Sequence, residues 1–180
     1  DLHDRVAVLL FDGVQMIDWS GPFEVFSGAH MAVVTATRDG RPVTASGGAR
    51  LTPTYALADV PPVDVLVVPG GDGVADVLDD SMVIDWVRAR AGTTGIVLSV
   101  CTGALVLAEA GLLQEGAATT FYDALEDLRT MAPRARVVND QRWVDEGKIV
   151  TTAGLSSGID GAFHVVDLAT RDTVSLDDYA

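Results

Sequence analysis

The sequence GIVLSVCTGALVLA, residues 95–108, decides the fold, because it joins a strand pattern to a helix pattern through one cysteine. A β-branched apolar run over residues 96–100 ends at Cys101, and an apolar helical pattern starts at Gly103. A strand, a tight turn and a helix in this order form a nucleophile elbow, which lifts one side chain above the carboxyl end of a parallel sheet. The stretch therefore predicts a reactive cysteine on an α/β fold.

The elbow also predicts a depressed pKa for Cys101, the single cysteine of the chain. The helix that follows would direct its N–H groups and the positive end of its dipole at the sulfur. Both stabilise the thiolate, which is the reactive form of cysteine. The alternative is a buried structural cysteine, because free cysteines are among the most buried residues. The flanking strand and helix favour the reactive interpretation.

Strand and helix patterns alternate along the whole chain. Strands are predicted over residues 5–11, 31–37, 63–68 and 96–100, with shorter ones at 137–138, 143–144 and 149–151. Helices are predicted from Ser20, as N-cap, through Pro22 to residue 26, and over 82–91, 103–110, 121–131 and 158–170, the last capped by Ser156 or Ser157. This order predicts an α/β sandwich with a mostly parallel sheet. No linker or repeat divides residues 1–180, which predicts one domain.

A glycine-rich loop follows the buried strand at residues 63–68. Its sequence PGGDG, residues 69–73, lacks the third glycine of a dinucleotide fingerprint and the Lys-Ser or Lys-Thr of a P-loop. The remaining functional interpretation is that backbone N–H groups of Gly70 and Gly71 approach a developing anion. The alternative is an ordinary glycine-rich turn.

Asp18 is the third candidate, because apolar residues surround it in the sequence QMIDWSGP, residues 15–22. A carboxyl group in a partly buried pocket can stay protonated near neutrality and donate a proton. The alternatives are an exposed carboxylate and a helix cap that competes with Ser20.

Histidines and metal ligands are poorly placed for catalysis. His3 lies near the start of the chain, His30 follows a predicted helix, and His164 lies within one beside apolar neighbours. No His-Glu-x-x-His motif or Cys/His pair at ligand spacing occurs, so neither a metal nor another cofactor is predicted.

The amino-acid composition limits the kinds of partner that the protein can bind. The chain has 12 Lys and Arg against 26 Asp and Glu, a net charge of −14, with Lys148 as its single lysine. Nucleic-acid binding is disfavoured because phosphate contacts need basic residues, and no apolar run approaches the length of a membrane span. No signal-peptide pattern opens the chain, and a lone cysteine fits a reducing cytoplasm. The acidic, lysine-poor composition favours a salt-rich host, although a merely acidic protein is the alternative.

Seven segments together resemble the ThiJ/PfpI superfamily, which has a class I glutamine amidotransferase-like fold of the flavodoxin type. They are LFDGV (10–14), DWSGP (18–22), DVLVVPGG (64–71), SVCTGA (99–104), AEAGLL (108–113), ATT (118–120) and GLSSGID (154–160). The resemblance covers nearly the whole chain and implies a flavodoxin-like three-layer sandwich. Within the superfamily, Cys-Thr-Gly rather than Cys-His-Gly is similar to isonitrile hydratases and to the amidase-like sensor domains of some transcription regulators.

The resemblance implies roles for particular residues. Cys101 would be the nucleophile, Asp18 its acid/base partner and Thr102 a neighbour of the sulfur, with Gly70 and Gly71 as main-chain donors. Phe121 and Gly154 would lie at the pocket. Many relatives carry histidine where this chain has Phe121, so a Cys–His dyad through that position is excluded.

The implied activity is addition of water to an isonitrile, which gives an N-substituted formamide through a covalent Cys101 thioimidate. The alternatives are a ligand- or redox-sensing domain without turnover, a glyoxalase or deglycase, and an amidase. The predicted partners are a small-molecule substrate and a second copy of the chain. The aromatic residues Trp19, Phe23 and Phe26 offer apolar surface beyond the needs of a core.

Overall fold

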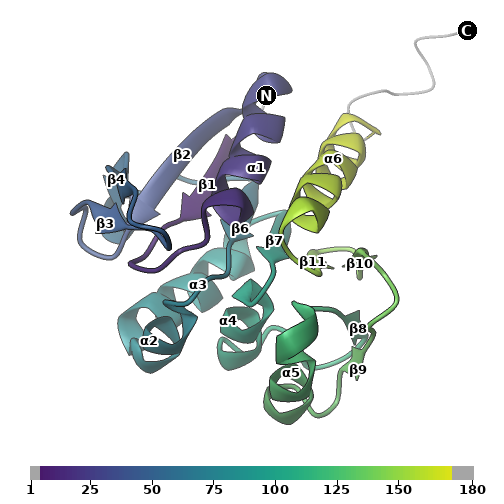
Figure 1. Cartoon of the computed structure of the whole chain (residues 1–180). Helices are drawn as coiled ribbons and strands as arrows, with labels where there is room; N and C mark the ends of the chain where they lie inside the picture. The colour runs from purple at the N-terminus through teal and green to yellow at the C-terminus, as the bar shows by residue number, and fades with distance from the viewer. Residues whose placement is uncertain (1–4, 172–180) are drawn as a thin grey trace, which may run out of the picture.

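A computed structural model describes residues 5–171 (Figure 1). Its central sheet has seven strands in the order β10-β11-β7-β6-β1-β2-β5, and every neighbouring pair is parallel except β10 and β11. The strands are β1 (Arg5–Leu9), β2 (Ala32–Thr37), β5 (Tyr55–Ala56), β6 (Val65–Val68), β7 (Ile96–Val100), β10 (Trp143–Asp145) and β11 (Ile149–Thr152). The inner strands β2, β1, β6, β7 and β11 follow the flavodoxin-like order, which confirms the predicted fold class.

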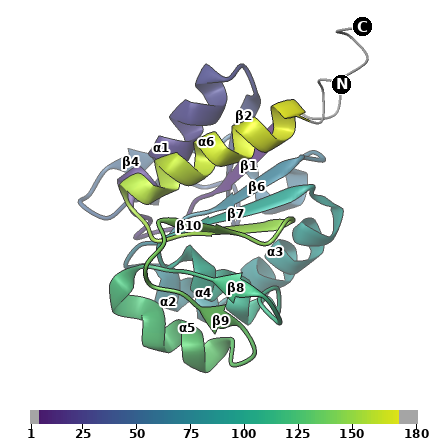
Figure 2. The same ribbon diagram turned by 90° about the vertical axis from the view of Figure 1, so that its right-hand side faces the viewer.

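Helices cover both faces of the sheet, as Figure 2 shows with the sheet seen between them. One face carries α1 (Met16–Gly28) and α6 (Ser156–Arg171), which pack against each other. The other side carries α2 (Val74–Asp79), α3 (Ser81–Thr93), α4 (Gly103–Glu109) and α5 (Leu125–Met131). The remaining short elements are β3 (Val43–Thr44), β4 (Arg50–Leu51), β8 (Ala117–Ala118), β9 (Arg136–Val137) and the 3-10 turns η1 (Leu57–Asp59) and η2 (Tyr122–Ala124).

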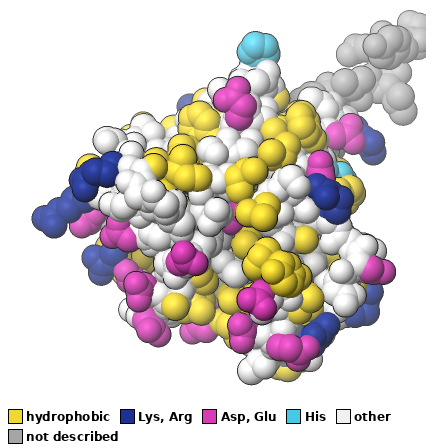
Figure 3. All heavy atoms as spheres, viewed as in Figure 1, with side chains coloured by type: hydrophobic (Ala, Val, Ile, Leu, Met, Phe, Trp, Pro, Cys, Tyr) yellow, Lys and Arg dark blue, Asp and Glu magenta, His cyan; other side chains and the backbone are white. Residues whose placement is uncertain are grey.

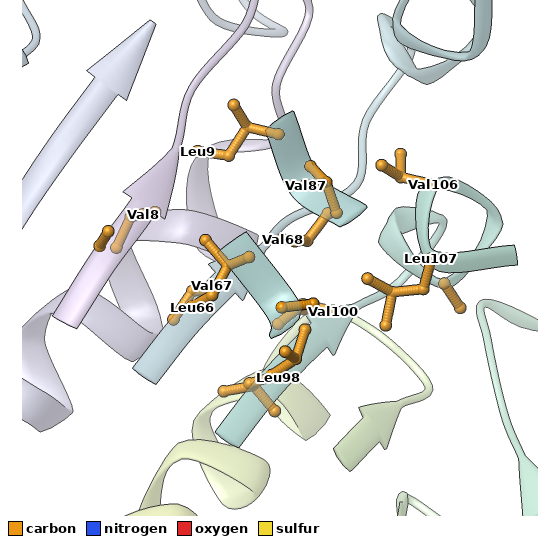
Figure 4. Packing of buried hydrophobic residues seen from close by; sticks show 14 of the residues in the cluster. Val8, Leu9, Leu66, Val67, Val68, Val87, Leu98, Val100, Val106 and Leu107 are labelled. Carbon is orange, nitrogen blue, oxygen red and sulfur yellow. The ribbon is translucent and has the colours of Figure 1, made fainter. Parts of the chain in front are cut away.

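The core lies on both sides of the parallel strands. All four residues of β6 are buried, as are Val8 of β1 and Leu98 of β7 (Figure 4). Helix α6 approaches β7 closely, because a Cβ at Gly158 would lie only 2.5 Å from Val100 Cγ1. A strand buried on both faces explains the continuous apolar runs in the sequence.

Three local predictions are wrong. Helix α1 begins at Met16 rather than at Ser20, whose hydroxyl donates to the Met16 carbonyl at 2.7 Å, and Pro22 lies inside the helix. Helix α6 begins at Ser156, so neither candidate serine precedes it as a cap. Phe26 is fully buried and is core rather than surplus surface. In each case tertiary packing overrides a local preference.

None of the helices over residues 5–171 is long and apolar enough to cross a membrane.

Candidate active site

The sheet order brings the three predicted segments to one place. Strands β1, β6 and β7 are neighbours, and the segments that carry Asp18, Gly70 and Cys101 leave their carboxyl ends in that order. The chain passes from β1 to β2 on one side, whereas β6 lies on the other side of β1. Ligands of open α/β sheets bind in the crevice at such a reversal. The topology therefore brings the three predicted segments to one crevice.

Cys101 occupies a strained elbow, as predicted. Its φ of +58° is in the left-handed region, which costs a residue with a side chain about 1–2 kcal/mol. Hydrogen bonds hold it: its N–H donates to the Thr152 carbonyl at 3.2 Å, and the Thr120 hydroxyl donates to its carbonyl at 2.7 Å. Gly154 lies directly against it, because a Cβ there would be 2.7 Å from the Cys101 Cβ. Surrounding contacts therefore fix the direction of the thiol.

Asp18 is fully buried in the first turn of α1, which excludes the exposed carboxylate. Its Oδ2 accepts the Gly70 N–H at 3.3 Å and its Oδ1 accepts the Leu155 N–H at 3.2 Å. Burial raises the pKa of Asp18, while these two bonds and a hydrogen bond with the Cys101 thiol oppose the rise. The structure therefore places a proton-exchanging group against the cysteine.

The predicted depression of the Cys101 pKa is wrong. Burial, as the largest cause, together with the Asp18 charge and the hydrogen bond to Asp18, raises the pKa of Cys101 to about 12. Hydrogen bonds from the backbone and hydroxyl of Thr102 lower the pKa, but they do not outweigh burial. The resting sulfur is consequently a thiol. Cys101 and Asp18 form a hydrogen-bonded pair that can exchange one proton.

The glycine-rich loop holds side chains at the site. The Gly70 N–H donates to Asp18, and the Gly71 N–H donates to the Thr102 hydroxyl at 3.1 Å. Gly71 has φ +136°, and a Cβ there would lie 2.2 Å from the Gly13 carbonyl oxygen. Only glycine fits this approach. Both N–H groups are engaged with the protein, so their role as donors to a substrate anion stays a prediction.

A pocket of about 630 Å³ opens beside Cys101 and Thr102. Phe121 and Leu155 line it, whereas Gly154 and Asp18 are not among its lining residues, although both lie against Cys101. Phe121 thus lies at the pocket as predicted, but Gly154 does not, because it packs directly against the Cys101 backbone and side chain.

Sequence reasoning missed the contributions of Leu155 and Thr120. The first acts through a backbone N–H and the second through a bond to the Cys101 carbonyl. Neither belongs to a recognisable catalytic pattern, although both lie in segments that carry the family resemblance, Thr120 in residues 118–120 and Leu155 in residues 154–160.

No group of three His, Cys, Asp or Glu side chains able to hold a metal occurs within the part of the chain that the structure describes. His164 lies elsewhere, where its Nε2 is 2.7 Å from Asp145 Oδ2 and its ring stacks on Trp143. His3 lies outside the described residues.

The pKa of Cys101 has a direct consequence for alkylation. Because the pKa is raised to about 12, the rate of labelling by iodoacetamide should keep rising between pH 8 and pH 11. Asp18→Asn removes the negative charge and should move the profile to lower pH. Intact-mass measurement of the labelling rate checks both expectations. A plateau below pH 8.5, or an unshifted profile in the variant, would contradict the arrangement.

Comparison with known proteins identifies relatives of this chain. The sequence matches the DJ-1/PfpI family over residues 4–168. It is 38% identical over 177 residues to an isonitrile hydratase of Pseudomonas putida, covering 96% of this chain and 75% of the relative. A 73-residue match, 48% identical, links 41% of this chain to 27% of a helix-turn-helix-type transcriptional regulator of Mycobacterium tuberculosis.

Solved structures show the same fold. A ThiJ/PfpI family protein from Pseudomonas syringae superposes with a TM-score of 0.82 at 24% identity, over 94% of this chain and 74% of the other. The family match spans most of the sequence, and the strand order and elbow agree with it. The chain belongs to the DJ-1/PfpI family.

Proposed function

We propose that the protein hydrates isonitriles to N-substituted formamides, with Cys101 as nucleophile and Asp18 as its proton-transfer partner. The observation that carries the proposal is a fully buried carboxyl group hydrogen-bonded to a thiol at a strained elbow beside a pocket. The isonitrile hydratase relative supports the same substrate class. The enzyme would be a hydro-lyase that uses no cofactor.

The first half-reaction adds the thiol across the terminal carbon of R–N≡C. Asp18 accepts the proton as the sulfur forms its bond to carbon, which supplies a thiolate only at the moment of attack. Asp18 then gives the proton to the same carbon, and the product is the thioimidate R–N=CH–S–Cys101. The enzyme therefore needs no resting thiolate, because the proton moves from Cys101 to Asp18 during the attack.

The second half-reaction consumes one water. Asp18 accepts a proton from the water as its oxygen bonds to the thioimidate carbon, and the nitrogen is protonated in turn. The C–S bond of R–NH–CH(OH)–S–Cys101 then breaks. The sulfur regains a proton by way of Asp18, and R–NH–CHO is released. One carboxyl group that alternates between acid and base performs all these transfers.

The other site residues position this pair. Thr102 donates hydrogen bonds to the sulfur, and the Gly71 N–H holds the Thr102 hydroxyl. Gly70 and Leu155 hold the two Asp18 oxygens. Phe121 contributes an apolar side chain to the pocket lining, so no histidine takes part in the reaction from that position.

A sensing role is the second candidate, because a 73-residue match at 48% identity is to a transcriptional regulator. Catalytic turnover distinguishes a hydratase from a sensor. Incubation with an alkyl isonitrile in D₂O should give a formamide whose formyl hydrogen is deuterium, as detected by NMR. Stoichiometric binding without formamide would favour the sensor and refute the hydratase.

We also propose that the protein acts in the cytoplasm as a homodimer. Phe163 of α6 is 61% exposed, on the helix pair α1/α6 that also carries Trp19 and Phe23, and Leu155, directly before α6, is 43% exposed. Light scattering should give twice the monomer mass at micromolar concentration. A monomer across that range would refute the dimer.

Salt should stabilise the protein, in line with a salt-rich host. The net charge of −14 produces self-repulsion that added salt screens. Each 1 kcal/mol of repulsion removed should raise Tm by about 2–4 °C for a chain of this size. Thermal melts from 0.05 to 2 M KCl check this, and a flat or falling series would remove the salt-adaptation proposal.

A further inference from the structure

One wall of the pocket beside Cys101 is apolar and comes from three helices on the same side of the sheet. Helices α2 and α4 pack together, as do α4 and α5. Together they supply the apolar lining side chains Val74, Ala75, Leu78, Leu105 and Met131. Pockets with such walls gain affinity from each apolar group that they remove from water.

The direction of this wall fits the shape of an isonitrile. The C–N≡C unit is linear, so a terminal carbon placed at the Cys101 sulfur carries the nitrogen substituent away from the sulfur, at the angle set by attack on the C≡N π bond. Asp18 lies outside the pocket lining and is fully buried, so no space for the substituent exists on that side. The pocket extends from Cys101 and Thr102 toward α2, α4 and α5, which leaves the apolar wall to receive the substituent.

The charged residues of this pocket are all acidic. Asp72, Asp123 and Asp127 line it, all three are exposed, and none of its described lining residues is Lys, Arg or His. Figure 3 shows hydrophobic side chains with Asp and Glu side chains among them on the lower part of this face. At low ionic strength a carboxylate about 7 Å from an anion disfavours it roughly threefold, so three disfavour it about 25-fold.

We infer that the pocket selects uncharged isonitriles with an extended apolar substituent on nitrogen, and that it rejects substituents ending in a carboxylate. This inference deepens the proposed function and rests on it for the identity of the reacting group. The apolar wall determines the preference for length, and the three carboxylates determine the preference for charge.

The charge preference is tested on Cys101 itself, without isonitrile chemistry. Two bromoacetamides with the same six-carbon chain, one ending in a methyl ester and one in a carboxylate, alkylate the protein at low ionic strength. Each rate is divided by that of the same reagent with N-acetylcysteine. The ester should react about 25-fold faster. The ratio should fall to about threefold in Asp123→Asn/Asp127→Asn.

Asp76→Asn/Asp79→Asn is the matched control, because it removes two exposed carboxylates of α2 that do not line this pocket. It should keep the ratio of about 25-fold. Equal rates for the two reagents, or the same ratio in both double variants, would overturn the charge preference.

The length preference is tested by comparing the alkylation rates of Cys101 with N-ethyl and N-hexyl bromoacetamide. Partial burial of four more methylenes should favour the hexyl reagent about tenfold, and Leu78→Asn should reduce this about threefold. No preference, or no effect of Leu78→Asn, would overturn the apolar-wall assignment. Selective alkylation without formamide formation from any isonitrile would refute the proposed function and leave the pocket selectivity standing. Hydration of ester- and carboxylate-ended isonitriles at equal rates would support the proposed function and overturn the charge preference.

Discussion

Cys101→Ala should abolish formamide formation. The account requires a covalent bond between the substrate carbon and the Cys101 sulfur, and no other cysteine exists in the chain. The rate should fall to that of the isonitrile in buffer. The variant should still fold, because the backbone bonds to Thr152 and Thr120 do not involve the thiol.

Intact-mass spectra and NMR of the reaction mixture check this prediction, and circular dichroism confirms that the variant is folded. An adduct of one isonitrile mass should appear on the wild-type protein and be absent from the variant. Formamide formation by folded Cys101→Ala would show that water adds without a covalent intermediate.

Asp18→Asn should lower turnover by about 100-fold or more, since an amide cannot accept and return the proton. Both Asp18 oxygens accept backbone N–H groups, from Gly70 and Leu155, so the amide nitrogen of Asn must face one of these donors. Leaving a buried donor without an acceptor costs about 1–3 kcal/mol of stability. Turnover is therefore measured per folded molecule, at a temperature well below the variant's Tm.

Asp76→Asn is the control for this second variant. It removes one exposed carboxylate of α2 outside the pocket and should keep wild-type turnover. A loss of only about tenfold in Asp18→Asn would mean that another group carries out most of the proton transfer.

The fold and the elbow were predictable because their signals are local. Strand β7 covers the predicted residues 96–100, since a β-branched run ends where Cys101 begins. The small elements β4, β8 and the six-residue α2 were not recognised, because such short segments have too few residues for a hydrophobic period.

The start of α1 shows where local preference fails. Ser20 and Pro22 resemble a helix start, but the chain turns at Gly13 with φ +79° and Val14 bridges to Gly71. These contacts direct the chain into a helix directly after Gln15. Asp18 consequently lies inside the first turn instead of before it, and only the sheet order could have shown this.

The electrostatics of the site were the least predictable part. The sequence places an N-terminal helix dipole beside Cys101 but says nothing about how deeply the sulfur is buried. Burial and Asp18 reverse the expected direction of the Cys101 pKa, and both depend on contacts between segments about 80 residues apart. The backbone donors to Asp18 are equally invisible in the sequence, because any residue has an N–H group.

The central claim is that Cys101 and Asp18 act as one catalytic unit, and a comparison of four proteins tests it most directly. Formamide release is measured at one isonitrile concentration for the wild type, Cys101→Ala, Asp18→Asn and the double variant. The account predicts that the double variant is scarcely slower than Cys101→Ala, because residues that act as a unit are not additive. Near-wild-type turnover by folded Asp18→Asn, or formamide formation above the buffer rate by folded Cys101→Ala, would contradict it.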